Sequence, residues 1–253
     1  DTLGANAVEF ILNHSEASVA LASADKLPKL AEALPKCEGV KTVVYWGDVA
    51  EEALAAVRAV DGIKVMSFDE LLEVGARAPD VSHPPKPSDI CTIMYTSGTT
   101  GDPKGVLLKH SATMQTIETL CKYLSTVGCE LGEEDVFLSY LPLAHIFDRV
   151  SEEMFLGVGG AIAYWQGDAK RLLDDIEAAK PTIFCGVPRI FDRVYSGVKA
   201  KIDANIVKKA LFHWGYHQKL GRLRSGAAQA HASWIFDQIL FKKIAAKLGG
   251  RVK

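Results

Sequence analysis

Tyr95-Thr96-Ser97-Gly98-Thr99-Thr100-Gly101-Asp102-Pro103-Lys104-Gly105 lies between the apolar runs 90–94 and 106–108 and is more informative about function than the rest of the chain. Glycines let backbone N–H groups approach a ligand closely, and successive N–H groups form a concave site for an anion. The threonine and serine hydroxyls add donors, and Lys104 adds a positive charge. Because apolar runs flank the stretch on both sides, we expect a strand–loop–strand arrangement that binds a polyphosphate. A solvated hairpin loop without a ligand is the alternative.

The spacing within this stretch argues against a common class of phosphate-binding loop. A Walker A loop requires G-x-x-x-x-G-K-[ST], in which the lysine directly follows a glycine. Here Asp102 and Pro103 separate Gly101 from Lys104, and Gly105 follows the lysine. We therefore disfavour a P-loop nucleoside triphosphatase.

Short β-rich runs alternate with segments of helical periodicity, which is typical of an α/β fold with mostly parallel sheets flanked by helices. We expect further strands over residues 19–21, 40–46, 63–66, 136–140, 160–165, 182–185 and 251–253. We expect helices around residues 3–12, 27–34, 49–60, 114–124 and 172–176, and almost throughout residues 189–248. Ser67 and Glu70 have the spacing of a capping box, and Asp168 is a candidate cap for the helix near Leu172.

The chain is punctuated by residues 79–87, which contain four prolines in nine positions. Such a segment is extended and resists folding into a helix or strand. We therefore expect residues 79–89 to connect a partial N-terminal βα subdomain, residues 1–78, with a nucleotide-binding α/β subdomain, residues 90–253. Because the sequence begins with Asp1 and ends in an expected strand, we expect both ends to continue in a longer protein.

The composition excludes some classes of partner. The chain has 29 basic and 31 acidic residues, and its net charge of −2 argues against an electrostatic nucleic-acid binder. The hydrophobic fraction of 48% is typical of a globular protein rather than a disordered one. The cysteines are dispersed without a C-x-x-C pair, which favours free thiols in a reducing, intracellular compartment. They are Cys37, Cys91, Cys121, Cys129 and Cys185.

Other residues offer candidate sites with competing interpretations. His145 lies in a proline-containing segment, residues 141–145, just after an expected strand, where α/β folds tend to bind ligands; a packing histidine is the alternative. His213 and His217 are four positions apart on an expected helix, but no third metal ligand accompanies them, so we interpret them as surface or packing residues. Residues 208–224 contain both basic and aromatic side chains. This composition is typical of an amphipathic helix that lies on an anionic membrane, and the alternative is a helix with one solvated face and one face packed on an ordinary core.

Residues 95–105 resemble the phosphate-binding signature of the adenylate-forming superfamily, roughly [YF]-T-[ST]-G-[ST]-T-G-x-P-K-G, and every position is filled. Residues 141–149, Leu-Pro-Leu-Ala-His-Ile-Phe-Asp-Arg, resemble a segment typical of the long-chain acyl-CoA synthetases within that superfamily. Residues 188–195, 1–4 and 7–11 also resemble this subfamily, in its eukaryotic and particularly its plant form. The resemblance extends over nearly the whole chain.

This resemblance implies that the chain is an internal part of the large N-terminal domain of a long-chain fatty acid–CoA ligase. Such enzymes use ATP with Mg²⁺ to convert a long-chain fatty acid into an acyl-adenylate, and CoA then takes the acyl group as acyl-CoA. The implied partners are these small molecules and not nucleic acid. We also expect peripheral contact with the endoplasmic reticulum or another organelle membrane.

The resemblance also implies roles for individual residues. The implied nucleotide-binding residues are Tyr95, Thr96, Ser97, Gly98, Thr99, Thr100, Gly101, Asp102, Pro103 and Lys104. By resemblance Lys104 is catalytic as well, because it would offset charge that develops on pyrophosphate, and Thr96 contacts the magnesium ion. His145 is the second implied catalytic residue and lines the pocket where the fatty carboxylate meets the α-phosphate.

Members of the subfamily are longer than this chain. By resemblance, their adenine-binding segment, acidic magnesium-binding segment, hinge and C-terminal domain with a catalytic lysine are expected beyond Lys253. We therefore expect the chain alone not to make acyl-CoA. Two other functions stay open, namely a non-catalytic nucleotide-binding fragment and another adenylate-forming ligase.

Overall fold

The computed structural model of the protein describes residues 6–96, 102–228 and 232–253. The chain divides into two compact units, Asp1–Thr113 and Met114–Lys253, and each is described by itself. The boundary between them falls within helix α5 (His110–Thr126). Residues 79–89 form no helix or strand and are exposed throughout. The division into residues 1–78, 79–89 and 90–253 that the sequence suggests stays a prediction.

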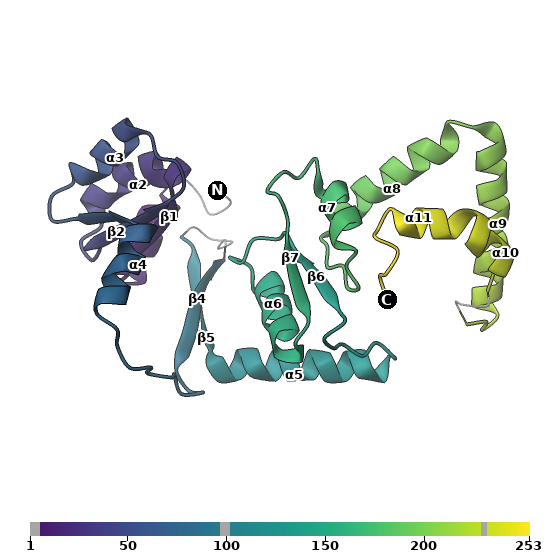
Figure 1. Cartoon of the computed structure of the whole chain (residues 1–253), viewed down its shortest axis with the longest axis horizontal. Coiled ribbons are helices and arrows are strands. Elements are labelled where there is room, and N and C mark those ends of the chain that lie inside the picture. Colours follow the sequence, from purple (N-terminus) through teal and green to yellow (C-terminus); the bar gives the residue numbers. More distant parts are fainter. Residues whose placement is uncertain (1–5, 97–101, 229–231) are drawn as a thin grey trace. The chain divides into compact units, whose positions relative to one another are not determined.

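The first unit contains a parallel sheet of three strands in the order β1 (Val19–Ser23), β2 (Thr42–Trp46) and β3 (Lys64–Ser67). Its helical elements are α1 (Ala7–His14), η1 (Ala24–Lys26), α2 (Leu27–Ala33), η2 (Leu34–Lys36), α3 (Glu51–Arg58) and α4 (Phe68–Arg77) (Figure 1). In the middle of the sheet, Val43 pairs with Ala20 on one side and Val65 on the other. This alternation of strand and helix confirms the expected α/β class.

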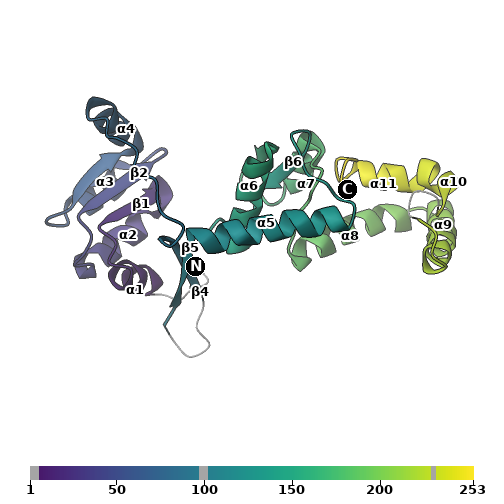
Figure 2. The same ribbon diagram turned by 90° about the horizontal axis from the view of Figure 1, so that it is seen from below.

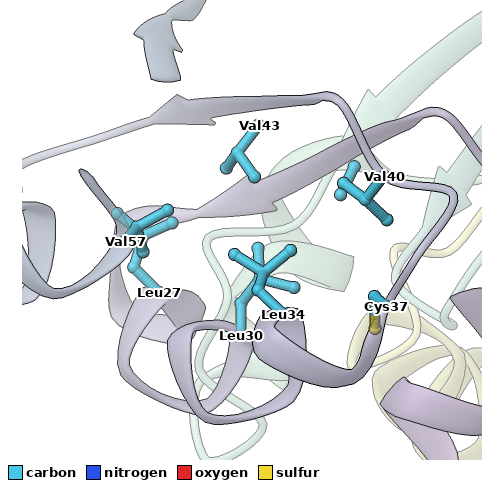
Figure 3. Packing of buried hydrophobic residues seen from close by; sticks show 8 residues of the cluster. Leu27, Leu30, Leu34, Cys37, Val40, Val43 and Val57 are labelled. Carbon is cyan, nitrogen blue, oxygen red and sulfur yellow. The ribbon is translucent and has the colours of Figure 1, made fainter. Parts of the chain in front are cut away.

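The core of the first unit forms because α2 and α3 turn apolar side chains toward the sheet. Leu27, Leu30 and Leu34 recur at helical spacing, so they share one face. Figure 3 shows Leu30 and Leu34 pointing toward Val43 of β2, with Val57 of α3 beside Leu27. Leu27, Val43 and Val57 are completely buried. Burial of each such side chain contributes roughly 1.5–3 kcal/mol to folding.

A capping box begins helix α4, as the sequence predicts. The backbone N–H of Glu70 donates to Ser67 Oγ at 3.1 Å, and the backbone N–H of Ser67 donates to Glu70 Oε2 at 2.6 Å. These bonds satisfy donors that the first turn of a helix otherwise leaves unpaired.

The first unit also contains an antiparallel hairpin, β4 (Ile90–Thr96) and β5 (Lys104–Lys109), which leads directly into α5. The expected strand–loop–strand arrangement is therefore confirmed. Residues 97–101 of the connecting loop lie outside the described residues.

The second unit is built around two parallel strands, β6 (Val136–Ser139) and β7 (Ala161–Tyr164). Successive side chains of a strand face opposite sides. Phe137 packs against Phe155 of α6 (Ile146–Val158), with ring centroids 5.3 Å apart. Leu138 packs in the same cluster as Ile176 of α7 (Leu172–Ala179). Helices therefore cover both faces of β6.

The remainder of the second unit is helical, as predicted. It comprises α8 (Pro188–Asp203), α9 (Ile206–Arg224), α10 (Trp234–Phe236), the π-helical turn η4 (Asp237–Phe241) and α11 (Lys242–Ala246) (Figure 2). Gly215 allows α9 to approach α10, because a Cβ at this position would lie 2.7 Å from the ring of Phe236. Among the described residues, no helix is long and apolar enough to cross a membrane.

Three local predictions are wrong. Residues 182–185 form only a single bridge, between Ile183 and Phe137, instead of a strand. At the start of this segment a side chain takes the place of one backbone acceptor, because Thr182 Oγ1 accepts from Val136 N–H at 3.0 Å while the Thr182 N–H donates to the Val136 carbonyl at 2.9 Å. Residues 251–253 form no strand, and only the Lys253 N–H bonds to the carbonyl of Thr182, at 2.9 Å.

The third wrong prediction concerns the cap of α7. Asp168 does not cap this helix, since its Oδ1 accepts from Lys170 N–H at 2.8 Å and Arg171 occupies the N-cap position. The Asp168 carboxylate therefore stabilises the turn that precedes α7.

We expect Ser67→Ala to lower the free energy of unfolding by about 1 kcal/mol, because the substitution removes the cap of α4. Urea denaturation followed by circular dichroism measures this change. Ser82→Ala is the matched control, because Ser82 is exposed in residues 79–89 and its side chain makes no hydrogen bond in the described part of the chain. Equal effects of the two substitutions would contradict a role for the cap.

Candidate functional site

The candidate phosphate site begins at the end of the β4–β5 hairpin, where Thr96 lies directly opposite Lys104. Directly opposed residues of an antiparallel pair project from the same face. Both side chains are exposed. Thr96 and Lys104 are therefore brought together, at the two ends of the loop that the sequence predicts to bind phosphate.

Lys104 carries a charge that is available to a ligand. Its ammonium group makes no ion pair or side-chain hydrogen bond within the described residues, and the nearby carboxylate of Asp102 is also exposed without such a partner there. Pro103, which precedes the lysine, is buried and restricts the backbone. The other predicted nucleotide-binding residues, Ser97, Gly98, Thr99, Thr100 and Gly101, lie outside the described residues.

The opposite face of the hairpin is anchored to α1 through Tyr95. A hydrogen bond of 2.7 Å joins the Tyr95 hydroxyl to His14 Nδ1. The Tyr95 ring also lies edge-on to Phe10, with ring centroids 6.5 Å apart. Burial raises the pKa of the Tyr95 hydroxyl. Tyr95 thus has a structural contact in addition to its predicted place in the nucleotide site.

Gly105 makes room for this anchor. It lies opposite Tyr95 in the hairpin, and a Cβ there would come within 3.3 Å of the Tyr95 ring and 3.0 Å of Ile93 Cγ2. His14 and Phe10, which contact Tyr95, are not predicted from the sequence as part of the site. Their i, i+4 spacing on one helical face was a signal for a shared contact, but it did not identify the partner.

The second predicted catalytic residue, His145, belongs to the second unit. It follows the carboxyl end of β6 and occupies the N-cap position of α6, as expected for a residue just past a strand. Its backbone N–H donates to the carbonyl of Pro142 at 3.0 Å, which closes the intervening turn. Its side chain is exposed and does not cap the helix. The imidazole therefore lies at a helix N-terminus, where partial positive charge favours anions.

A buried polar cluster that the sequence does not predict lies beneath this segment. Ser139 Oγ donates to Asp148 Oδ2 at 3.1 Å, and the Asp148 side chain is completely buried. The Tyr140 hydroxyl donates to the carbonyl of Cys185 at 2.9 Å, and burial together with the charge of Asp148 raises its pKa to about 12. In the sequence, Asp148 resembles its charged neighbours in α6, so the sequence pattern does not indicate that its side chain is buried.

His213 and His217, the other candidate pair, lie on α9. The rings of His213 and His217 stack with centroids 6.4 Å apart on α9. Across residues 6–96, 102–228 and 232–253, no group of three or more histidine, cysteine, aspartate or glutamate side chains is suited to a metal ion.

The chain matches known proteins over nearly its whole length. The family model described as AMP-binding enzyme matches residues 1–245. "Long chain acyl-CoA synthetase 4" of Arabidopsis thaliana is 44% identical over 255 aligned residues, which cover 100% of this chain and 38% of the relative. "Probable CoA ligase CCL6" of Humulus lupulus is 40% identical with the same coverage.

Solved structures show the same fold. The adenylation domain of a carboxylate reductase from Mycobacterium chelonae superposes with a TM-score of 0.72 at 22% identity, over 98% of this chain and 36% of that one. A putative long-chain-fatty-acid CoA ligase from Rhodopseudomonas palustris gives 0.61 at 22% identity, over 77% of this chain and 44% of that one. The expected adenylation-type fold is therefore confirmed.

We expect Tyr95→Phe to lower the free energy of unfolding by about 0.5–1.5 kcal/mol, because it removes the hydrogen bond to His14. Chemical denaturation measures the loss. In a His14→Ala background the same substitution should have little further effect, since the partner is already absent. Tyr164→Phe is the matched control, because Tyr164 is 70% exposed. Additive losses for Tyr95 and His14 would contradict the anchor.

Proposed function

The chain belongs to the family of AMP-binding enzymes, and we propose that it contributes the phosphate-binding part of a long-chain acyl-CoA synthetase. It spans 38% of the length of long chain acyl-CoA synthetases 4 and 5 of Arabidopsis thaliana, so the activity of the whole protein is a proposal. The observation that carries the proposal is the β4–β5 hairpin, which sets Lys104 opposite Thr96 where the signature loop begins and ends; within residues 6–96, 102–228 and 232–253 the lysine has no ion-pair partner.

The proposed reaction has two steps. A carboxylate oxygen of the fatty acid forms a bond to the α-phosphorus of ATP, and the bond from that phosphorus to the bridging oxygen breaks, releasing pyrophosphate. The thiol sulfur of CoA then bonds to the acyl carbon and AMP leaves, while the thiol gives up its proton. A carboxylate alone lacks a good leaving group, so the task of the protein is positioning and charge neutralisation.

We assign the outer phosphates to the hairpin. Loop N–H groups and hydroxyls would hold the β- and γ-phosphates, and Lys104 would neutralise charge on the departing pyrophosphate. The exposed hydroxyl of Thr96 fits a magnesium ion as one of few protein ligands, because Mg²⁺ keeps several waters and binds phosphate oxygens. When bound, the ion would neutralise phosphate charge and orient the triphosphate.

We assign the reacting carboxylate and α-phosphate to His145. Its exposed imidazole and the N-terminus of α6 together offer donors and positive potential to oxygens that gain charge. The structure describes the hairpin and His145 in separate units, so the shared site is part of the proposal.

ATP–pyrophosphate exchange by the full-length protein tests the proposed function, with fatty acids of different chain length as the varied substrate. Exchange that depends on a long-chain fatty acid is the expected result. Exchange only with another carboxylic acid would favour a different adenylate-forming ligase. Nucleotide binding without exchange would favour a non-catalytic nucleotide-binding protein, and release of ADP would contradict adenylation altogether.

We expect Lys104→Ala in the full-length protein to slow adenylation by about ten- to a hundredfold, because hydrogen bonds to charged groups contribute roughly 1.5–3 kcal/mol. Pyrophosphate exchange measures this step. Thioester formation from preformed acyl-adenylate should change much less. Lys109→Ala, at the far end of β5, is the matched control. Equal loss in both steps would assign Lys104 to the fold.

We further propose that the helical part of the second unit contacts an anionic intracellular membrane, such as that of the endoplasmic reticulum. Residues 188–253 contain 14 basic and 3 acidic side chains, whereas residues 1–187 contain 15 and 28. Exposed apolar side chains accompany this positive charge, including Trp214 and Trp234, which are 65% and 71% exposed. Positive charge with exposed aromatic side chains favours binding at an anionic lipid surface.

One basic residue of α9 is not available for this membrane contact. Lys219 of α9 is directed to Asp237 of η4 in an ion pair, so it is not available to lipid head groups. The contact would therefore depend on the other basic residues and on the exposed tryptophans, rather than on one amphipathic face of α9.

We expect the double variant Trp214→Ala/Trp234→Ala to bind phosphatidylserine-containing vesicles about tenfold more weakly, because partial burial of two large apolar side chains is lost. Co-sedimentation with vesicles measures the change. Tyr164→Ala, an exposed aromatic residue in the acidic part of the chain, is the matched control. Binding should weaken as salt is raised. Equal binding to neutral phosphatidylcholine vesicles would contradict the proposal.

A further inference from the structure

Asp148 is an ionisable side chain in an unusual place. It lies in the first turn of α6, three positions after His145, and is completely buried. Acidic residues in a first helical turn usually remain at the surface and favour the positive end of the helix dipole. Here the carboxylate turns inward, and its Oδ2 accepts from Ser139 Oγ at 3.1 Å.

This contact joins the two elements that flank the His145 segment. Ser139 is the last residue of β6, and Asp148 belongs to α6, so the bond spans residues 140–145. Burial raises the pKa of the Asp148 carboxyl, while hydrogen bonding by Ser139 and by the backbone of Leu141 opposes that rise. The carboxylate is therefore held by the strand end, through the Ser139 hydroxyl.

The rest of the surroundings does not satisfy Asp148. Its Oδ1 is buried without a hydrogen-bond partner among the described residues, and so is Oε1 of Glu152, one turn further along α6. The charge of Glu152 also raises the pKa of Asp148. A buried carboxylate oxygen without a partner costs stability, and an apolar side chain of similar size would avoid that cost. Asp148 is therefore poorly explained as a residue that only stabilises the fold.

We propose that Asp148 is a positioning residue for His145. Its bond to Ser139 fixes residues 140–145 between β6 and α6, and the turn closed by His145 N–H and the Pro142 carbonyl transmits this order to the imidazole. The fixed imidazole then meets the carboxylate that is to be adenylated. This inference rests on the proposed function, because His145 needs an anionic substrate group to act upon.

Kinetics of the full-length protein test the positioning role. A displacement of about 1 Å at a reacting group slows a reaction by about a hundredfold, so Asp148→Ala should lower the adenylation rate constant by about ten- to a hundredfold. The KM for ATP should stay nearly unchanged, because the phosphates are held elsewhere. Asp148→Asn keeps an oxygen that accepts from Ser139, and it should restore most of the rate.

Two further variants separate positioning from general damage. In a His145→Ala background, Asp148→Ala should cause little additional loss of rate, because it acts only through the histidine. Glu153→Ala is the matched control on α6, because Glu153 pairs with Arg149 instead of with the buried cluster. Multiplicative losses for Asp148 and His145, or failure of Asp148→Asn to restore the rate, would overturn the proposal.

Hydrogen exchange distinguishes failure of this inference from failure of the proposed function. Backbone amides of residues 140–145 should exchange faster in Asp148→Ala than in the wild type or in Asp148→Asn, whether or not the protein is active. Unchanged exchange would show that Asp148 does not order the segment. If exchange rises as expected but the wild type adenylates no carboxylic acid, the ordering role stands and the proposed function fails.

Discussion

The antiparallel pairing of β4 with β5 is the constraint on which the proposed phosphate site depends. The register sets Thr96 opposite Lys104, so the ammonium group is held at the base of the loop by a ladder of backbone hydrogen bonds. A slip of one residue between the strands would place the two side chains on opposite faces. The position of the positive charge therefore depends on backbone pairing rather than on a side-chain contact of the lysine itself.

The two faces of this hairpin make different contacts, because successive side chains of a strand point to opposite faces. Tyr95 points to α1 and bonds to His14, while its neighbour Thr96 points the other way with Lys104. Gly105 leaves space for the Tyr95 ring on the anchored face. The anchored face thus limits motion of the strand ends, and the free face leaves an exposed hydroxyl and an exposed cation for a ligand.

In the second unit, the candidate residue His145 lies in a segment that is not ordered by strand pairing. No backbone ladder covers residues 140–145, and the segment is instead bounded by a buried hydrogen bond between Ser139 and Asp148. Such a bond is strong in a low dielectric but leaves Asp148 Oδ1 without a partner among the described residues. The unpaired oxygen lowers local stability, while the bond to Ser139 restrains residues 140–145. Functional sites commonly combine strain with a fixed geometry in this way.

The α/β class, the strand–loop–strand hairpin, the capping box at Ser67 and the position of His145 after a strand could be predicted from the sequence, because each depends on local spacing and periodicity. Contacts between distant segments are not encoded in local patterns and follow only from packing. Thr182 bonds to β6 through its side chain, the expected strand over residues 182–185 is reduced to one bridge, and Asp168 stabilises a turn instead of capping α7. Above all, Asp148 is buried beneath the His145 segment, whereas its neighbour Arg149 pairs with Glu153. Adjacent residues of a helix point in different directions, so Asp148 faces β6 while Arg149 faces Glu153 on the helix surface. The periodicity of α6 alone does not indicate which side of the helix packs against β6.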